Sequence, residues 1–182
     1  MWIWILVILA VVSADQLTKQ LVLNFLDRNE SFVVIPKVFR FTYVENRGAA
    51  FGMLDEHRWI FMIVSTVAIV LLIGYMFKFS EKSKLLRTGL SLIIGGGIGN
   101  MIDRVAYGYV VDFLDFCAFP DLWMWVFNVA DACVCVGAGI VVLYLIVDIV
   151  KESKKLKEAK IQDETNEETE ENKENEENKE NE

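Results

Sequence analysis

Two aspartates in the second half of the chain have the surroundings expected of an acid pair. Asp112 lies in the apolar run YVVDFLDF and Asp131 in NVAD, and neither has a basic residue within seven positions. If the fold brings the two carboxyl groups together, both cannot stay ionised, so one of them holds a proton. A carboxylate beside a carboxylic acid can deprotonate a water and protonate a peptide carbonyl or a leaving amine. This pair therefore predicts aspartyl-protease chemistry.

Other polar residues occur in pairs three or four positions apart beside apolar stretches. The pairs are Asp15 with Lys19, Asn100 with Asp103 or Arg104, and Asn128 with Asp131. Each pair lies on one face of a helix, and ionisable groups at membrane depth are costly enough to indicate a functional site. Because Asp103 and Arg104 have opposite charges, we expect structural pairing of Asp103 with Lys19 or of Arg104 with Asp15. The alternative is that all of these acids only join helices or cap their ends.

The elements that must position these residues are apolar stretches about as long as a membrane span, which needs about 20 helical residues. They cover about 2–26, 59–77, 86–102 and 122–150, and they predict an all-α membrane protein with four transmembrane helices. The first stretch resembles a signal-peptide core ending at Val12-Ser13-Ala14. No basic residue precedes it and apolar residues resume as LVLNFL, so we expect it to be retained as the first helix.

Basic residues in the short connections predict the orientation. FKFSEKSKLLR joins the second and third spans and KESKKLKEAK follows the fourth, so both should be cytoplasmic. The N- and C-termini then lie inside, and the segments of about 27–58 and 103–121 lie outside. We expect a multi-pass protein of the cytoplasmic membrane with its polar site near the outer face.

The outer segment SFVVIPKVFRFTYVENRGAAFGML alternates β-branched and aromatic residues with polar ones and then breaks at glycines. This pattern favours strands. We expect VVIP, FRFTYV and AAFGML to form a small extracellular β-cradle at about 32–56, between the first two helices, with a turn at Asn46-Arg47-Gly48. The alternative is an ordinary extracellular loop.

The last 32 residues differ from the rest of the chain in composition. From Lys151 onward there are seven lysines and thirteen acidic residues, which account for −6 of the net charge of −8. We divide the chain into a peptidase domain at 1–150 and a charged cytoplasmic tail at 151–182. The low-complexity segment 162–182 cannot bury a core and is predicted to be disordered.

The residue inventory excludes several kinds of chemistry. His57 is the only histidine, which argues against most zinc sites and against a Ser-His or Cys-His triad. Cys117, Cys133 and Cys135 lack metal-binding spacing and are predicted to be small apolar core residues. We predict no metal and no cofactor, so hydrolysis would depend on carboxylates.

Four stretches together resemble the bacterial lipoprotein signal peptidase, or type II signal peptidase. They are DQLTK (15–19), ENRGAAFG (45–52), GGGIGNMIDRVAYGYVVDF (95–113) and FNVADACVCVG (127–137). The resemblance covers about residues 2–150, with matching order and spacing, and the acidic tail lies outside the family pattern. It implies an intramembrane aspartyl endopeptidase that cuts the signal peptide of a prolipoprotein before the lipid-modified cysteine. Its partners would be lipid-modified prolipoproteins and membrane lipids, and not nucleic acid.

The resemblance also implies roles for individual residues. Asp112 and Asp131 fall on the catalytic dyad. Asn46, Asn100, Arg104 and Asn128 match polar residues that line the site in the family. Asp15, Lys19 and Asp103 match residues of a structural polar network.

Asp103 is the competing candidate for the dyad. It is flanked by Arg104 and shares a helix face with Asn100, which favours a permanently ionised acid and a poor proton donor. Asp112 follows the turn Tyr107-Gly108-Tyr109 in an apolar run, so we assign the dyad to Asp112 with Asp131.

Two other classes of function stay open at this point. A small transporter or proton relay would also use intramembrane acids, but it predicts acids throughout the membrane depth, whereas here only Asp148 departs from the outer cluster. A noncatalytic scaffold that recruits partners through its acidic tail predicts that truncation after residue 161 abolishes function.

Overall fold

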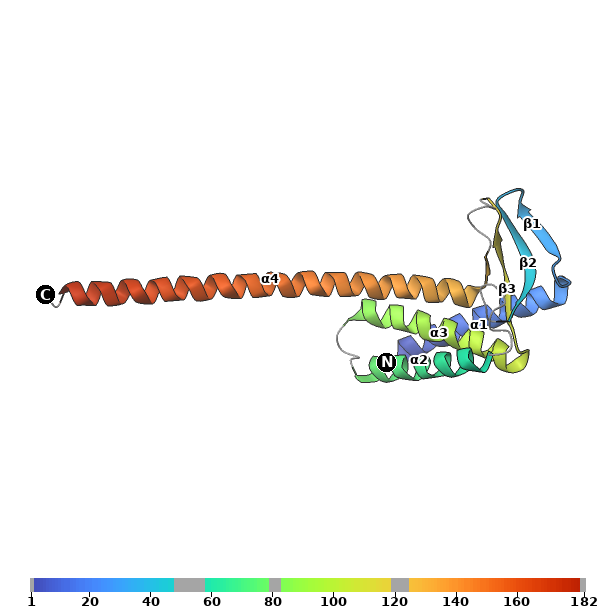
Figure 1. Ribbon diagram of the computed structural model, residues 1–182, viewed down its shortest axis with the longest axis horizontal. Helices are drawn as coiled ribbons and strands as arrows, with labels where there is room; N and C mark the ends of the chain where they lie inside the picture. Colours follow the sequence, from blue (N-terminus) through green and yellow to red (C-terminus); the bar gives the residue numbers. More distant parts are fainter. Residues whose placement is uncertain (1, 48–57, 79–82, 119–124, 181–182) are drawn as a thin grey trace. The chain divides into compact units, whose positions relative to one another are not determined.

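The computed structural model describes residues 2–47, 58–78, 83–118 and 125–180 (Figure 1). Within these residues the helices are α1 (Trp2–Phe25), α2 (Arg58–Lys78), α3 (Lys84–Ala106) and α4 (Val129–Glu180). Among the described residues, three segments are long and apolar enough to cross a membrane, namely α1, α3 and the Val129–Glu158 part of α4. The apolar helical stretch Met62–Lys78 of α2 is shorter. The prediction of a helical membrane protein is confirmed as far as the length and the apolar composition of these helices.

The glycine-rich run of α3 allows close helix packing. A Cβ atom added to Gly95 would lie 2.8 Å from the Cβ of Val11 on α1, and one added to Gly89 would lie 2.8 Å from the carbonyl oxygen of Gly137 on α4. Small residues let membrane helices approach closely where apolar burial gives little driving force. The run therefore holds α3 against both helices that carry the other polar residues.

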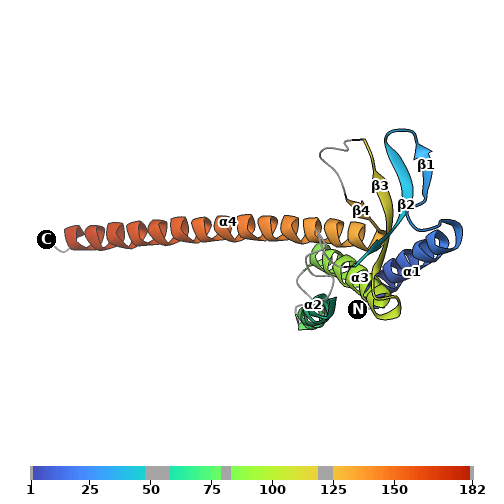
Figure 2. The ribbon, with the colours of Figure 1, turned by 45° about the vertical axis from the view of Figure 1, so that its right-hand side comes forward.

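The strands form one antiparallel sheet in the order β1-β2-β3-β4 (Figure 2). They are β1 (Ser31–Ile35), β2 (Phe39–Asn46), β3 (Val110–Phe116) and β4 (Val126–Phe127). The end of β2 pairs with the start of β3, so that Val44 faces Asp112 and Asn46 faces Val110. A core cluster of Val22, Tyr43, Val111 and Phe113 joins α1 to the sheet.

The predicted location of the sheet was incomplete. In the described part of the chain, β1 and β2 come from the segment between the first two helices, whereas β3 and β4 come from the segment between α3 and α4. Alternation in YVVDFLDF is weak because both faces of β3 are largely covered, so the period-2 signal is lost. The predicted strand AAFGML lies outside the described residues, as does Gly48 of the predicted turn.

Two predicted span boundaries also need correction. The third helix runs to Ala106 rather than to 102, which places Asp103 and Arg104 within α3. The fourth begins at Val129 rather than at 122, because Val126 and Phe127 pair with Asp115 and Leu114 of β3 as strand β4. An apolar run alone does not distinguish a short paired strand from the first turn of a helix.

The tail and the cysteines differ from the sequence-based predictions. The helix α4 continues to Glu180, although we predicted disorder from 162; glutamate and lysine are strong helix formers, so composition there opposes burial but not helix formation. Cys117 and Cys133 are partly buried and Cys135 is exposed, so the prediction of three core cysteines was wrong for Cys135. An apolar helix face turned to lipid needs no burial in protein.

Candidate active site

Asp112 sits on the buried side of β3, where hydrogen bonds hold both of its carboxylate oxygens. It is 2% exposed. Its Oδ1 accepts a hydrogen bond of 2.6 Å from the side-chain amide of Asn128, and its Oδ2 accepts one of 2.8 Å from the amide of Asn46. The Asn46 contact is possible because β2 ends beside β3 in this register. The sheet thus fixes the carboxyl group from two sides.

Asp131 is placed by the start of α4. Asn128 precedes the first helical residue, its Oδ1 accepts a hydrogen bond of 2.8 Å from the Asp131 backbone N–H, and Asp131 Oδ2 accepts one of 3.3 Å from the Asn128 backbone N–H. These reciprocal bonds have the form of a helix capping box, with Asp in place of Glu. The positive end of the helix dipole also favours an anionic side chain there. Local sequence therefore orients this acid.

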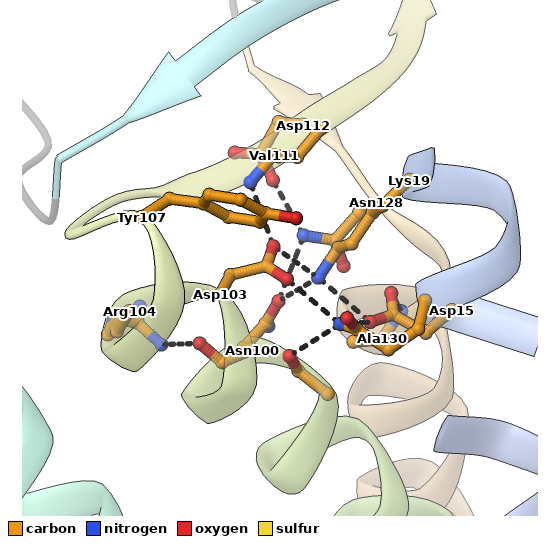
Figure 3. Close-up of polar contacts among 12 residues, drawn as sticks. Asp15, Lys19, Asn100, Asp103, Arg104, Tyr107, Val111, Asp112, Asn128 and Ala130 are labelled. Atoms are coloured by element: carbon orange, nitrogen blue, oxygen red, sulfur yellow. Dashed lines mark hydrogen bonds and ion pairs between the residues drawn. The ribbon is translucent and has the colours of Figure 1, made fainter. Parts of the chain in front are cut away.

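Asn100 and Asn128 connect the two acids. Asn100 donates a hydrogen bond of 2.7 Å to Asp131 Oδ1, and its own Oδ1 accepts one of 3.0 Å from Asn128. The two N–H bonds of the Asn128 amide thus go to Asn100 and to Asp112. Figure 3 shows Asn128 between Asp112 and Asn100. Asp112 and Asp131 are consequently both hydrogen-bonded to Asn128, the residue that caps α4.

The second acidic group, Asp15 with Asp103, is ion-paired with a single buried lysine (Figure 3). Lys19 Nζ lies 2.8 Å from Asp15 Oδ2, 2.9 Å from Asp103 Oδ2 and 2.9 Å from Asn100 Oδ1. All three ionisable side chains are essentially inaccessible to solvent. An ammonium group has three donors, and here each has an acceptor. The predicted pairing of Asp103 with Lys19 is the one that the structure contains.

Arg104 does not take the alternative pairing. Its guanidinium donates a hydrogen bond of 3.2 Å to the backbone carbonyl of Asn100, one turn earlier in α3. It also interacts electrostatically with Asp131 and Asp112. With Arg104, all nine predicted site residues belong to one connected polar cluster drawn from α1, α3, α4, β2 and β3.

Three contacts in this cluster were not predicted. Gln16 donates a hydrogen bond of 2.8 Å to Asp103, the backbone N–H of Val111 donates one of 3.0 Å to the same carboxylate, and the backbone N–H of Ala130 donates one of 2.9 Å to Asp15. Gln16 lies inside the quoted DQLTK motif, so its polarity beside Asp15 was an available signal. Backbone donors leave no signal in a sequence. These bonds join α1 to α3 and to the start of α4, and they join α3 to the start of β3.

Burial gives Asp112 a higher pKa than an ordinary surface aspartate has. Removal from solvent, together with the negative charge of Asp131, raises the pKa of Asp112 to about 7, although hydrogen bonds from Asn46 and Asn128 and the charge of Lys19 act in the opposite direction. A carboxyl group that titrates near neutrality can either give or accept a proton at working pH. The arrangement can therefore activate a water and protonate a leaving group.

Metal chemistry has no matching donor set here. In the part of the chain that the structure describes, no three or more His, Cys, Asp or Glu side chains are grouped so as to hold a metal ion. Asp15 and Asp103 are instead ion-paired with Lys19, and Asp131 accepts a hydrogen bond from the Asn100 amide.

Comparison with known proteins gives consistent similarities. Residues 7–147 match the family model described as signal peptidase (SPase) II. The lipoprotein signal peptidase of Caldanaerobacter subterraneus subsp. tengcongensis is 48% identical over 143 residues, covering 79% of this chain and 94% of the relative. That of Halothermothrix orenii is 44% identical over 140 residues, covering 77% and 92%. The tail after 147 lies outside the family match.

A solved structure agrees with these similarities. A bacterial membrane enzyme determined at 2.3 Å by the in meso method superposes with a TM-score of 0.75 at 32% sequence identity, covering 82% of this chain and 90% of that one. A second such structure, at 1.9 Å, gives a TM-score of 0.74.

Proposed function

The chain belongs to the signal peptidase II family, and we propose that it is an intramembrane aspartyl endopeptidase with Asp112 and Asp131 as its catalytic dyad. Its substrate would be a prolipoprotein, cut before the diacylglyceryl-modified cysteine. The observation that carries this assignment is the division of the acids into two groups. Asp15 and Asp103 are ion-paired with Lys19, whereas Asp112 and Asp131 are held by asparagine amides. Within the part of the chain that the structure describes, no ion pair joins Asp112 or Asp131 directly to a cationic side chain.

The mechanism follows from the proton that two neighbouring acids can share. The ionised member of the dyad removes a proton from a water, which attacks the scissile carbonyl carbon directly. The protonated member donates its proton to the carbonyl oxygen, which gives a tetrahedral gem-diol intermediate. The member that took the proton from the water then donates it to the leaving amine, the other member takes back one hydroxyl proton, and the C–N bond breaks. No covalent enzyme intermediate is required. Asn100 and Asn128 would hold both carboxyl groups at fixed positions, and the Arg104 charge would stabilise the negative charge that develops at the site.

We propose a topology of four transmembrane helices with both termini cytoplasmic. The lysine-rich connection around Lys84 and the segment after Lys151 support this orientation. The dyad would then lie near the outer face of the cytoplasmic membrane, with the sheet as an extracellular cradle over it. The diacylglyceryl chains could stay in an apolar medium while the signal peptide lies among the helices.

The test is cleavage of a lipid-modified prolipoprotein by purified protein in detergent. We expect wild-type protein to cleave it, and Asp112→Asn and Asp131→Asn each to abolish cleavage while the folded variants still bind substrate. Asp103→Asn should act mainly through stability or site geometry, because it removes one partner of buried Lys19. The dyad assignment is wrong if Asp112→Asn cleaves well at normal expression while Asp103→Asn is folded, binds substrate and is inactive.

A further inference from the structure

A large apolar cavity of about 660 Å³ opens beside the site and is not used by the proposed mechanism. Its walls are the end of α1, with Leu21, Val22 and Phe25, and the covered face of the sheet, with Phe113. Val129, the first residue of α4, also lines it. Phe113 follows Asp112 in β3, where successive side chains point to opposite faces of the strand, and Val129 follows Asn128. The cavity is therefore lined by the immediate chain neighbours of two residues of the polar cluster.

The cavity offers no free polar group among its lining side chains. Its lining is apolar except for Thr18, whose single hydroxyl hydrogen is shared between the carbonyl oxygens of Ala14 and Asp15 in its own helix, each 2.8 Å from Oγ1. An extended peptide backbone placed there would leave N–H and C=O groups unpaired, which is costly in an apolar environment. The occupant must therefore be a chain without hydrogen-bonding groups or a helix.

Size argues against a helix. An α-helix with its side chains is about 10–12 Å across, so a cavity of this volume holds roughly one turn. A signal-peptide helix of several turns does not fit lengthwise. A hydrocarbon chain is thinner, has no groups to satisfy and can enter from the lipid side, where Leu21 and Phe25 are 48% and 78% exposed.

We propose that this cavity binds one fatty acyl chain of the diacylglyceryl group on the substrate cysteine. The proposal rests on the proposed function, because that function places a cysteine with two acyl chains next to the scissile bond. An acyl chain seated between Leu21 and Phe113 would fix the cysteine, and with it the scissile bond, relative to Asp112. Binding would thus also distinguish a lipid-modified substrate from an unmodified one, since an unmodified cysteine has no acyl chain to fill the cavity.

Photocrosslinking tests the position of the acyl chain. The probe is a lipid-modified prolipoprotein with a diazirine in the middle of an acyl chain, bound to the full-length Asp131→Asn variant so that the complex persists. We expect labelled peptides from the end of α1, around Leu21 to Phe25, and from β3 around Phe113. Labelling confined to the α2–α3 groove around Ile69 and Met101 would overturn the proposal.

Two matched variants test the effect on catalysis. Leu21→Trp fills the cavity, whereas Leu17→Trp places the same side chain one turn earlier on α1, at a position that is 63% exposed and does not line the cavity. The acyl chain would enter the cavity from lipid rather than from water, so its binding gains little from the hydrophobic effect. Leu21→Trp should therefore remove only the packing contacts of the chain and its fixed orientation. We expect Leu21→Trp to raise KM by roughly three- to tenfold, and Leu17→Trp to match wild type.

The failure of this proposal is distinguishable from that of the proposed function. If Leu21→Trp and Leu17→Trp have the same KM and the same labelling pattern, the cavity does not bind the acyl chain even though cleavage occurs. If wild-type protein does not cleave the substrate, the proposed function fails, and the labelling experiment, which needs no cleavage, still decides what the cavity binds.

Discussion

Replacing Asn46 by leucine removes a hydrogen bond that favours the ionised form of Asp112. The amide of Asn46 lies 2.8 Å from Asp112 Oδ2, and this bond lowers a pKa that burial and Asp131 raise to about 7. A hydrogen bond to a charged group contributes about 1.5–3 kcal/mol, and 1.36 kcal/mol corresponds to a tenfold change in a protonation equilibrium. Since Asn46 is largely exposed, water replaces part of the lost bond, and we expect the pKa of Asp112 to rise by about one.

The measurement is the pH dependence of kcat for cleavage of a lipid-modified prolipoprotein. If Asp112 acts as the base, activity falls as pH drops through about 7, because the ionised form is lost; if it acts as the acid, activity falls as pH rises through the same value. In both cases Asn46→Leu moves the midpoint of that limb to higher pH by about one pH unit. The shape of the wild-type profile also decides which role Asp112 has.

Glu45→Gln is the matched control. Glu45 is the preceding residue of β2, and its carboxylate contacts Arg28 and Arg47 rather than Asp112, so the midpoint should stay at its wild-type value. Thermal unfolding of both variants checks that they fold. An unchanged midpoint in a folded, active Asn46→Leu variant would refute either the hydrogen bond or the assignment of the limb to Asp112.

Three further outcomes follow from the helices. Lys19→Met leaves two buried carboxylates without their cation, so we expect a loss of about 3–5 kcal/mol of stability, measured as a lower unfolding temperature in detergent; wild-type stability would contradict the buried ion pairs. Gly99→Ala should destabilise the protein because its Cβ would lie 2.5 Å from Asp15 Oδ2, whereas Gly139→Ala, with nothing within 4 Å, should be neutral or stabilising by up to about 1 kcal/mol; equal unfolding temperatures would argue against the close approach. Truncation after residue 161 should leave cleavage nearly unchanged, and loss of activity would support a role for the tail.

The sequence by itself determined the apolar helices and the identity of the polar residues. The uncharged run of α2 and the glycine-rich run of α3 are local patterns, and so is the Asn128-x-x-Asp131 cap, which needs only residues three positions apart. The resemblance to a known family added the order in which these pieces occur. These features could be predicted because each depends on neighbours in the chain.

Only the tertiary structure decided how the acids are divided. Asp103 and Asp112 are nine positions apart and both could have faced Asp131; Lys19 of α1 engages Asp103, and the end of β2 brings Asn46 to Asp112. Strand β3 shows no period-2 alternation, because both of its faces are largely covered, so the position of Asp112 in a sheet could not be read from its surroundings. Which carboxyl group is ion-paired and which is left to titrate depends on contacts across as many as 84 positions, such as that of Lys19 with Asp103, and such contacts are set by packing rather than by local pattern.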